Sequence, residues 1–238
     1  VLLDGGERID ADAVVVNADP AAVSAGRFGE AVRRAVPATP PRRRSLSAVV
    51  WTAVAPTGGF PLIRHNVFFS PDYPAEFEAL AAGRLAERPS TYLCAQDRDD
   101  AGSAPAGPER LQIIVNAPAI GDARAFTPAE IDRCTHAMQA TLARGGLSLE
   151  LAPELTGLTT PTDFERLFPS TGGALYGPAS HGWAASFRRP GSGTRIPGLY
   201  LAGGSTHPGA GVPMAALSGR LAAASLVSDL APAKGSRG

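Results

Sequence analysis

The fold of this chain is decided by one stretch near its carboxyl end, Gly198-Leu-Tyr-Leu-Ala-Gly-Gly-Ser-Thr-His-Pro-Gly-Ala-Gly-Val-Pro-Met214. It starts with a short apolar run, Leu199 to Ala202, which is typical of a buried strand. Glycines follow at Gly203, Gly204, Gly209 and Gly211. Because glycine adopts positive φ and has no side chain, such a turn brings backbone N–H groups close to a ligand. The stretch predicts a strand, a tight turn and a helix that begins near Pro213.

The helix that leaves this turn has two different faces. Met214, Leu217 and Leu221 recur at helical spacing and form an apolar stripe. The other face can pack closely on a sheet or a cofactor because its residues are small: Ser218, Gly219, Ala222 and Ala223. The start of a helix offers free N–H groups and a partial positive charge, which favour an electron-rich partner. By itself, the pattern fits a tight structural turn in an α/β protein equally well.

Length and composition exclude several classes of protein. The 238 residues suffice for one large domain or two small ones. The formal net charge is zero, so nothing favours broad nucleic-acid binding. No apolar run approaches the roughly 20 residues that span a bilayer. Cys94 and Cys134 lack C-x-x-C spacing, which predicts buried thiols in a reducing, cytoplasmic compartment rather than a disulfide or a metal site.

The usual partner of a glycine turn is missing from the amino-terminal part of the sequence. A strand followed by G-x-G-x-x-G, which holds the phosphates of a dinucleotide, occurs nowhere in the chain. Val1 to Ile9 instead predicts a hairpin with Asp4-Gly5 at its turn. We therefore expect the chain to be the carboxyl-terminal portion of a longer protein. The alternative is a trimmed amino terminus that lacks only a few residues.

The remaining pattern predicts a mixed α/β (α+β) chain. Ala13 to Val16 suits a strand buried on both faces of a parallel sheet, and Pro20 breaks the run. Thr127-Pro-Ala-Glu130 is a capping box that opens a helix ending near Arg144. Further strands are expected over residues 46–54, 66–69, 91–95, 111–116 and 147–151, and further helices over 21–35 with interruptions at Gly26 and Gly29, 75–86 and 160–168.

These elements predict two domains and a tail. Residues 1–25 and 195–230, the two ends of the chain, are expected to share one domain. Residues 26–194, with most of the strands and helices, are expected to form the other, which has a common domain size. Residues 231–238 have the composition of a disordered tail.

Several polar residues have a functional and a plainer interpretation. His207, in the glycine turn, would either bind a cofactor or move a proton, or it would cap the turn or face solvent. Asp163 is interpreted as a helix first-turn carboxylate rather than a catalytic acid. A metal site is not expected, because no ligand spacing links Cys or acidic residues to His65, His136 and His181.

Two further groups of residues also have both a functional and a plainer interpretation. Arg42 to Arg44 would either touch anionic lipid head groups or belong to a solvated linker. Six aromatic residues would either line an apolar pocket or, for most of them, belong to the core: Trp51, Phe68, Phe69, Tyr92, Phe164 and Phe168.

Four stretches of the chain resemble the bacterial phytoene desaturase family of carotenoid desaturases. Leu199 to Pro213 is similar to the carboxyl-terminal flavin signature of that family. The other three are Ala11 to Asp19, Phe68 to Phe77 and Leu158 to Phe164. Tyr92-Leu-Cys-Ala-Gln-Asp-Arg98, with Val115-Asn-Ala-Pro118, most resembles the hydroxyneurosporene and methoxyneurosporene desaturase branch, which introduces a 3,4 double bond into 1-hydroxycarotenoids.

The resemblance implies a flavoprotein that binds FAD and a long carotenoid. Residues 1–25 and 195–230 would then form an incomplete Rossmann-like FAD domain, and residues 26–194 a substrate-binding domain. In this family a hydride moves from a C–C unit to flavin N5, and the neighbouring carbon loses a proton. The resemblance does not identify a catalytic acid or base. The cofactor-binding residues that it implies are Gly203, Gly204, Ser205, His207, Gly209, Gly211, Val212, Pro213 and Met214.

The chain departs from the family pattern in two ways. Gly203-Gly204 stands where many flavin oxidoreductases place a ribitol-binding Asp or Glu, so backbone contacts must replace that carboxylate. The amino-terminal nucleotide motif is absent, so we expect this chain alone to bind FAD weakly or not at all and to need the missing portion as its partner. Carotenoids partition into bilayers, so peripheral contact with the inner face of the membrane is expected. Phytoene desaturation, a retinoid or carotenoid saturase or isomerase, and a non-catalytic isoprenoid-binding module remain the alternatives.

Overall fold

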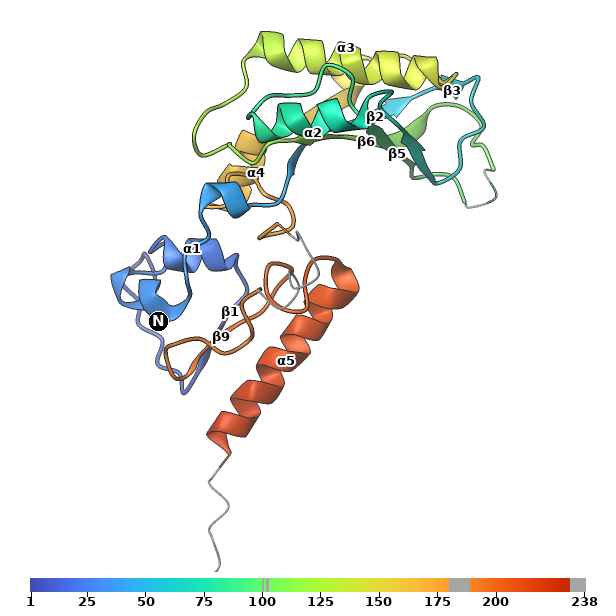
Figure 1. Ribbon diagram of the computed structural model, residues 1–238. Coiled ribbons are helices and arrows are strands. Elements are labelled where there is room, and N and C mark those ends of the chain that lie inside the picture. The colour runs from blue at the N-terminus through green and yellow to red at the C-terminus, as the bar shows by residue number, and fades with distance from the viewer. Residues whose placement is uncertain (100, 102, 180–188, 232–238) are drawn as a thin grey trace, which may run out of the picture. The chain divides into compact units, whose positions relative to one another are not determined.

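The structure is a computed structural model that describes residues 1–99, 101, 103–179 and 189–231 and divides the chain into two compact units (Figure 1). The sheet unit comprises Leu46–Leu167 and Gly172–Leu175. The terminal unit comprises Val1–Ser45, Phe168–Thr171 and Tyr176–Gly238. Both chain ends therefore lie in one unit, and residues 26–45 and 189–194 lie there with them instead of in the sheet unit. Which unit serves a cofactor and which a substrate stays a prediction. The expected tail beyond Ala231 lies outside the described residues, as does His181.

A 5-stranded antiparallel sheet in the order β4-β5-β6-β2-β8 forms the body of the sheet unit. Its strands are β2 (Ser47–Ala55), β4 (His65–Phe68), β5 (Thr91–Ala95), β6 (Glu109–Ala117) and β8 (Thr156–Thr159). The strands expected between residues 46 and 116 are all confirmed, with ends that shift by at most two residues. Sequence reasoning missed β8, because this strand is short and contains Gly157.

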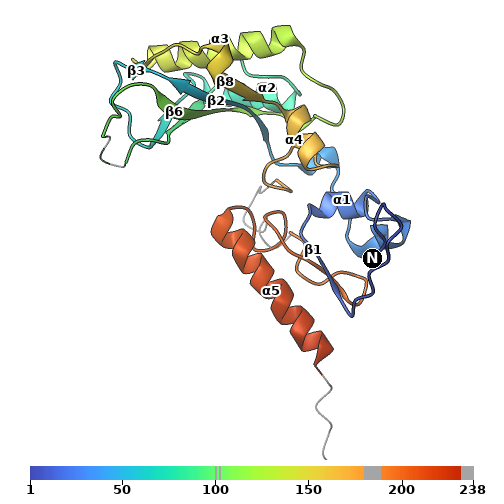
Figure 2. The same cartoon turned by 180° about the vertical axis from the view of Figure 1, so that it is seen from behind.

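Side-chain alternation gives this sheet one filled face and one open face. Trp51, Leu93 and Ile113 point to the filled face and are at most 2% exposed. The helix α3 (Pro128–Arg144) lies over that side, as the opposite views in Figures 1 and 2 show, and α2 (Tyr73–Ala81) lies near the end of β6, where Glu76 accepts a hydrogen bond from Asn116 at 3.1 Å. Met138 and Leu142 of α3 belong to the same apolar cluster. On the open face Val67 is 52% exposed, whereas Ala48 and Val50 of β2 are buried.

Local signals set the ends of both helices. Thr127 and Glu130 form the reciprocal capping box that the sequence predicts, and α3 ends at Arg144. Asp72 caps α2, which ends at Ala81 rather than at residue 86, because Gly83 adopts a φ of +72°. The shorter elements of this unit are β3 (Thr57–Gly58), β7 (Ser148–Leu149), η3 (Pro153–Leu155) and α4 (Pro161–Leu167). The strand expected over 147–151 is thus only two residues long.

In the terminal unit, β1 (Val14–Val16) and β9 (Leu199–Leu201) pair in parallel, with Val15 opposite Tyr200. The parallel arrangement is as predicted, but Val15 is 44% exposed, so burial on both faces is not observed. The helix expected over 21–35 is also corrected. Gly26 and Gly29 both adopt positive φ and separate α1 (Pro20–Ser24) from the 3-10 helix η1 (Glu30–Ala35). A second 3-10 helix, η2 (Pro41–Arg43), follows.

The long helix α5 (Val212–Leu230) packs through its small residues. Ser218 and Ala222 are at most 1% exposed, and Ala222 shares an apolar cluster with Tyr200 at β9. The Tyr200 hydroxyl also donates a hydrogen bond of 2.7 Å to Asp229 of the helix. The small face therefore makes the close contact with the strand that the sequence predicts. The apolar stripe of Met214, Leu217 and Leu221 is 37–39% exposed.

The sheet unit buries an ion pair between Arg98 and Glu109. Two N–O distances of 2.8 Å join the guanidinium to the carboxylate, whose side chain is 2% exposed. Arg98 also donates to the Leu62 carbonyl at 3.1 Å and to the Thr57 hydroxyl at 3.1 Å. The hydrogen bonds from Arg98 lower the pKa of Glu109, so the carboxylate stays charged. Removing one partner would leave the other charge buried and unpaired.

We predict that Glu109→Gln lowers the free energy of unfolding of the sheet unit by about 3 kcal/mol at neutral pH. Because the pKa of Glu109 is lower in the folded state, its contribution is present above the unfolded pKa of roughly 4.3 and is lost as the pH falls through the folded pKa. The difference between wild type and variant should therefore shrink in acid. Urea unfolding followed by Trp51 fluorescence, in a Trp183→Phe background, measures both effects.

Asp97→Asn is the matched control for this experiment. Asp97 pairs with Arg110, whose side chain is 66% exposed, in the same pair of strands. Because water screens such a pair, its loss should change the free energy of unfolding far less. Equal losses in the two variants would contradict the prediction.

Candidate functional site

The turn from Gly203 to Gly211 connects β9 to α5 and has a backbone that only glycine adopts readily. Gly203, Gly209 and Gly211 have φ values of +130°, +140° and +106°. Any other side chain would be strained in these conformations. The glycine turn that the sequence predicts is therefore present, and these three glycines are required by its geometry.

Ser218 of α5 holds this turn against the helix. Its hydroxyl accepts the N–H of Gly203 at 2.7 Å and lies 2.8 Å from the hydroxyl of Thr206. Thr206 in turn donates to the Gly203 carbonyl at 2.6 Å. Ser218 and Thr206 are at most 1% exposed. Because these buried polar groups satisfy one another, they favour a single conformation of the turn.

The parallel pairing of β1 with β9 brings the end of β1 to the same turn. Asp19 accepts the Ala21 N–H at 2.8 Å through one oxygen, and so caps α1. Its other oxygen accepts the hydroxyl of Ser205. Asn17 lies 3.4 Å from the position that a Cβ on Gly203 would take. Two strand carboxyl ends thus meet here, which is where sheets with parallel strands bind their ligands.

Arg189 places a positive charge beside the turn. Its guanidinium donates to the carbonyls of Gly204 at 3.2 Å and Pro178 at 3.3 Å, and it lies 3.5 Å from the position of a Cβ on Gly209. Burial lowers the pKa of Arg189, and the charge of Asp19 opposes that change. An open cavity of about 390 Å³ adjoins this side chain and is lined by Ser45, Tyr176, Pro178, Arg189, Pro208, Gly209 and Ala210.

The helix α5 begins without a side-chain cap. Gly211 precedes it, and a Cβ at that position would meet nothing within 4 Å. Val212, in the first turn, is 85% exposed. The N–H groups of Val212 and Met214 lack carbonyl partners within the helix, as in any first turn. An uncapped helix start with open space before it fits the electron-rich edge of a flat ring such as flavin.

The structure gathers all the predicted cofactor-binding residues in this turn and in the first turn of α5. They are Gly203, Gly204, Ser205, His207, Gly209, Gly211, Val212, Pro213 and Met214. The Ser205 hydroxyl is already bonded to Asp19, and the backbone N–H of His207 donates to the Pro190 carbonyl at 2.8 Å. Contact of these residues with a cofactor stays a prediction.

Sequence reasoning missed the side chains that shape the turn. Thr206 lies inside the quoted motif, but a threonine among glycines carries no signal of its own. Ser218 was noted only for its small size. A serine on the small face of an otherwise Ala- and Leu-rich helix is the signal that would have found it, because a buried hydroxyl needs a partner. Arg189 had no signal in the sequence.

The structure confirms the plainer interpretation of Asp163 but not that of the six aromatic residues. Asp163 accepts the N–H and the hydroxyl of Thr160 at 2.9 and 2.7 Å, and these bonds lower its pKa, so it serves as a helix cap. Trp51 and Phe68 belong to the core. Phe69 and Phe168 are more than half exposed, and Tyr92 and Phe164 are only partly buried, so the expectation that most of these six residues belong to the core is wrong.

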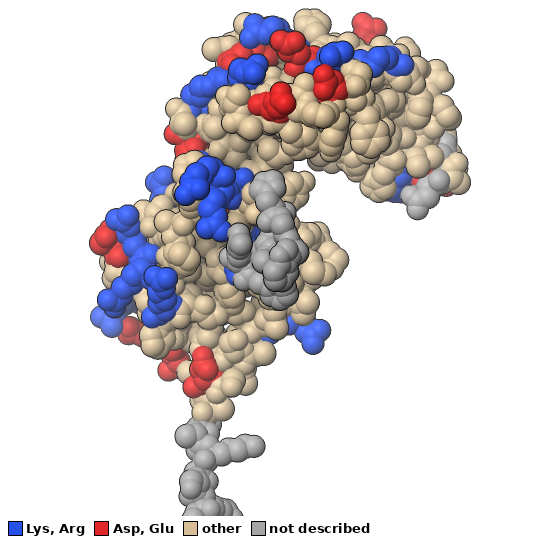
Figure 3. Space-filling model, viewed as in Figure 1, with Lys and Arg blue, Asp and Glu red and all other residues tan. Residues whose placement is uncertain are grey.

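Three observations on the described residues concern other kinds of site. No group of three His, Cys, Asp or Glu side chains in this part of the chain is arranged to hold a metal ion. No helix of residues 1–231 that the structure describes is long and apolar enough to cross a membrane. Figure 3 shows basic and acidic side chains interspersed over the visible face of the sheet unit, unlike the single-sign surface of a nucleic-acid binder.

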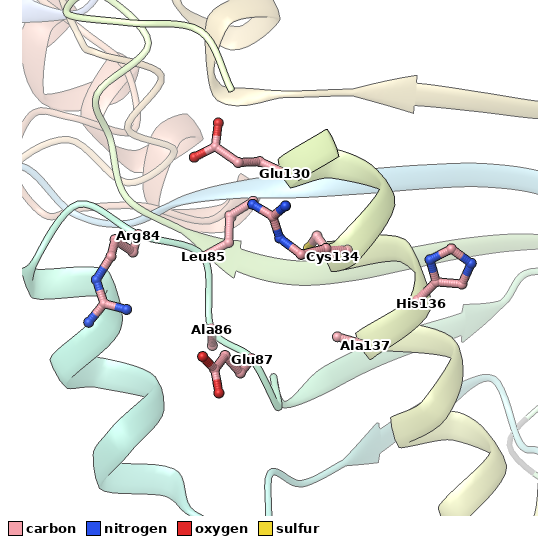
Figure 4. A pocket seen from close by; sticks show the side chains of 9 residues that line it. Arg84, Leu85, Ala86, Glu87, Glu130, Cys134, His136 and Ala137 are labelled. Carbon is pink, nitrogen blue, oxygen red and sulfur yellow. The ribbon is translucent and has the colours of Figure 1, made fainter. Parts of the chain in front are cut away.

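A second cavity, of about 460 Å³, lies on the helix side of the sheet unit (Figure 4). The segment 84–87 lines it on one side, and Cys134 and His136 of α3 on the other. Burial raises the pKa of the Cys134 thiol to about 12, so the thiol stays protonated and is a poor nucleophile. The cavity therefore offers no evident chemistry, and it is not part of the glycine turn.

Comparison with known proteins identifies close relatives. The chain is 54% identical over 231 residues to the hydroxyneurosporene desaturase of Rubrivivax gelatinosus, covering 97% of this chain and 44% of that protein. It is 46% identical to the hydroxyneurosporene desaturase of Cereibacter sphaeroides, covering 97% of this chain and 46% of that protein. It is 33% identical over 172 residues to a 1-hydroxycarotenoid 3,4-desaturase of a Flavobacterium species, covering 67% of this chain and 33% of that protein.

The chain thus spans less than half the length of these curated relatives. The same comparisons match residues 1–227 to a family of flavoproteins, a range that includes β1, β9, the glycine turn and most of α5. The sequence signature, the turn geometry and this match agree. The chain belongs to the flavin containing amine oxidoreductase family.

Proposed function

We propose that this chain is part of an FAD-dependent carotenoid desaturase that introduces a C–C double bond into a 1-hydroxycarotenoid. The observation that carries the proposal is the glycine turn, pinned by Ser218 and open at the uncapped start of α5. The relatives, which are named as hydroxyneurosporene and 1-hydroxycarotenoid desaturases, support the choice of substrate. We further propose that the chain acts within a longer polypeptide whose other portion supplies the nucleotide phosphate site.

In this proposal the turn binds FAD, and bound FAD supplies the hydride-accepting chemistry of the reaction. Gly203 and Gly204 let the backbone approach the cofactor in place of a carboxylate side chain. The N–H groups of Val212 and Met214 stabilise negative charge on the facing edge of the ring, and no reorganisation is needed for this. Arg189, half-buried beside the turn, adds a fixed positive charge.

The proposed function predicts a product that is easy to detect. In cells that accumulate a 1-hydroxycarotenoid, the full polypeptide that contains this chain should extend the conjugated system by one double bond. The absorption maxima of the extracted pigment should move to longer wavelength, and its mass should fall by two hydrogens. Liquid chromatography with mass spectrometry checks both.

The same experiment separates the alternatives. Turnover of phytoene with no change in the hydroxylated substrate would favour a phytoene desaturase. A gain of two hydrogens would indicate a saturase, and an unchanged mass with a new retention time an isomerase. Binding of the pigment without any product would favour a non-catalytic isoprenoid-binding module.

The role of the turn in flavin binding is tested by Ser218→Ala in the full polypeptide. This change leaves the Gly203 N–H buried without its acceptor, which costs about 1–3 kcal/mol. We expect flavin to bind to the variant about tenfold more weakly or worse, because the cofactor must then order a turn that Ser218 already pins in the wild type. Ser228→Ala, at an exposed site on the same helix, is the control and should retain flavin as wild type does. Equal flavin content in both purified variants would contradict the assignment.

We also propose that the protein contacts the inner face of the membrane from the cytoplasm. Phe69, Tyr73 and Phe77 support this, because they are 68%, 49% and 39% exposed and form a ladder with ring separations of 6.4 and 4.9 Å. Exposed aromatic rings are typical of surfaces that lie at a membrane interface.

The paired substitution Phe69→Ser and Phe77→Ser should reduce binding of the full polypeptide to phospholipid vesicles severalfold. Leu155→Ser is the control, since Leu155 is 52% exposed but lies outside the ladder. Flotation of the proteins with vesicles gives the bound fraction. Loss of binding in the control alone would point to a different contact surface.

A further inference from the structure

The strand register aligns a row of side chains across the open face of the sheet unit. Val67 of β4 lies opposite Tyr92 of β5, and Tyr92 lies opposite Ile114 of β6. Ile114 in turn lies opposite Val50 of β2. Since neighbouring strands are about 4.8 Å apart, the row crosses four strands over roughly 14 Å. Val67 is 52% exposed and Tyr92 and Ile114 are partly exposed, whereas Val50 is only 7% exposed, so the accessible part of the row is Val67 and Ile114 with the phenol of Tyr92 between them.

A polar row runs beside this one. It is the next register row on the same face and contains His65, Cys94, Gln112 and Thr52. Val67 is 52% exposed and His65 is exposed, whereas α3 packs on the other side of the sheet. The open face therefore offers apolar surface at Val67 and Ile114 with hydrogen-bonding groups along one edge of it.

His65 and Tyr92 join the two rows. The Nδ1 atom of His65 lies 2.7 Å from the Tyr92 hydroxyl, and the two rings stack at 6.2 Å between centroids. This bond uses one ring nitrogen and leaves Nε2 of His65 for a ligand. Burial, with a smaller effect of Cys94, raises the pKa of Tyr92, so the phenol stays protonated at neutral pH. The pair can both donate to and accept from an alcohol.

We infer that the His65–Tyr92 pair binds the hydroxyl group at the end of the carotenoid substrate, while Val67 and Ile114 contact the adjoining hydrocarbon. The inference rests on the proposed function. A hydroxyl taken from water into an apolar site loses several kcal/mol of hydration unless it finds a partner, so a site for hydroxylated polyenes needs such a pair beside its apolar track.

The chemistry of the substrate gives this contact a purpose. In a 1-hydroxycarotenoid the hydroxyl is on carbon 1 and the reacting bond joins carbons 3 and 4. An anchor on the hydroxyl, whose oxygen is three bonds from carbon 3, therefore fixes which bond of the chain is presented for reaction. His65 and Tyr92 are positioning residues in this account, and they determine specificity for the oxygenated end.

The test compares two substrates, a 1-hydroxycarotenoid and the same polyene without the hydroxyl, with the full polypeptide as wild type and as Tyr92→Phe. The change keeps the ring and removes only the hydroxyl. We expect wild type to prefer the hydroxylated substrate in kcat/KM. In Tyr92→Phe, kcat/KM for the hydroxylated substrate should fall about tenfold, mainly through a higher KM. The kcat/KM for the substrate without the hydroxyl should not change, so the ratio of the two values becomes smaller.

His65→Phe should have the same effect, and His136→Phe, which changes an exposed histidine on α3, is its matched control. An unchanged KM for the hydroxylated substrate in both Tyr92→Phe and His65→Phe would overturn the inference, as would a wild type that uses both substrates equally. A wild type that desaturates neither substrate would instead refute the proposed function. Retained flavin content in the variants shows that any loss is not a folding defect.

Discussion

The contact between α5 and β9 is the constraint on which the terminal unit depends. It brings a helix against a strand at a distance that only small side chains allow, and it buries the Ser218 hydroxyl at that contact. A buried hydroxyl must be paired, and the groups within reach are the Gly203 N–H and the Thr206 hydroxyl. The shape of the turn is therefore a consequence of how the helix packs. The same packing leaves the helix start without a cap.

Most of the backbone geometry of the glycine-rich stretch was predictable from the sequence, because the φ value of a residue is a local property. Gly203, Gly209 and Gly211 occupy conformations that other residues avoid, so glycine at those positions carries the information directly. The bond between Ser205 and Asp19 joins residues 186 positions apart, and no local pattern reports it. The same holds for Arg189, which is known only from the carbonyls it meets in three dimensions.

The sheet unit shows the same division between local and non-local information. A high content of β-branched and aromatic residues predicted β2, β5 and β6, because such side chains pack well on a half-buried sheet. It could not predict β8, whose four residues have no buried member. The boundary of the terminal unit was also out of reach, since residues 26–45 join it through contacts that are distant in sequence, such as that of Ser45 with Gly177.

In the segment Tyr92 to Arg98, which contains most of β5, some side chains pack in the core and others lie on the open face. Leu93 and Ala95 point inward and are fully buried, and Arg98 holds the buried carboxylate of Glu109. Tyr92 and Cys94 point to the open face, where a change alters no core packing. A single step along such a strand takes a side chain from the core to the other face. Substitutions on the open face are then less constrained by packing than those on the core side of the same strand.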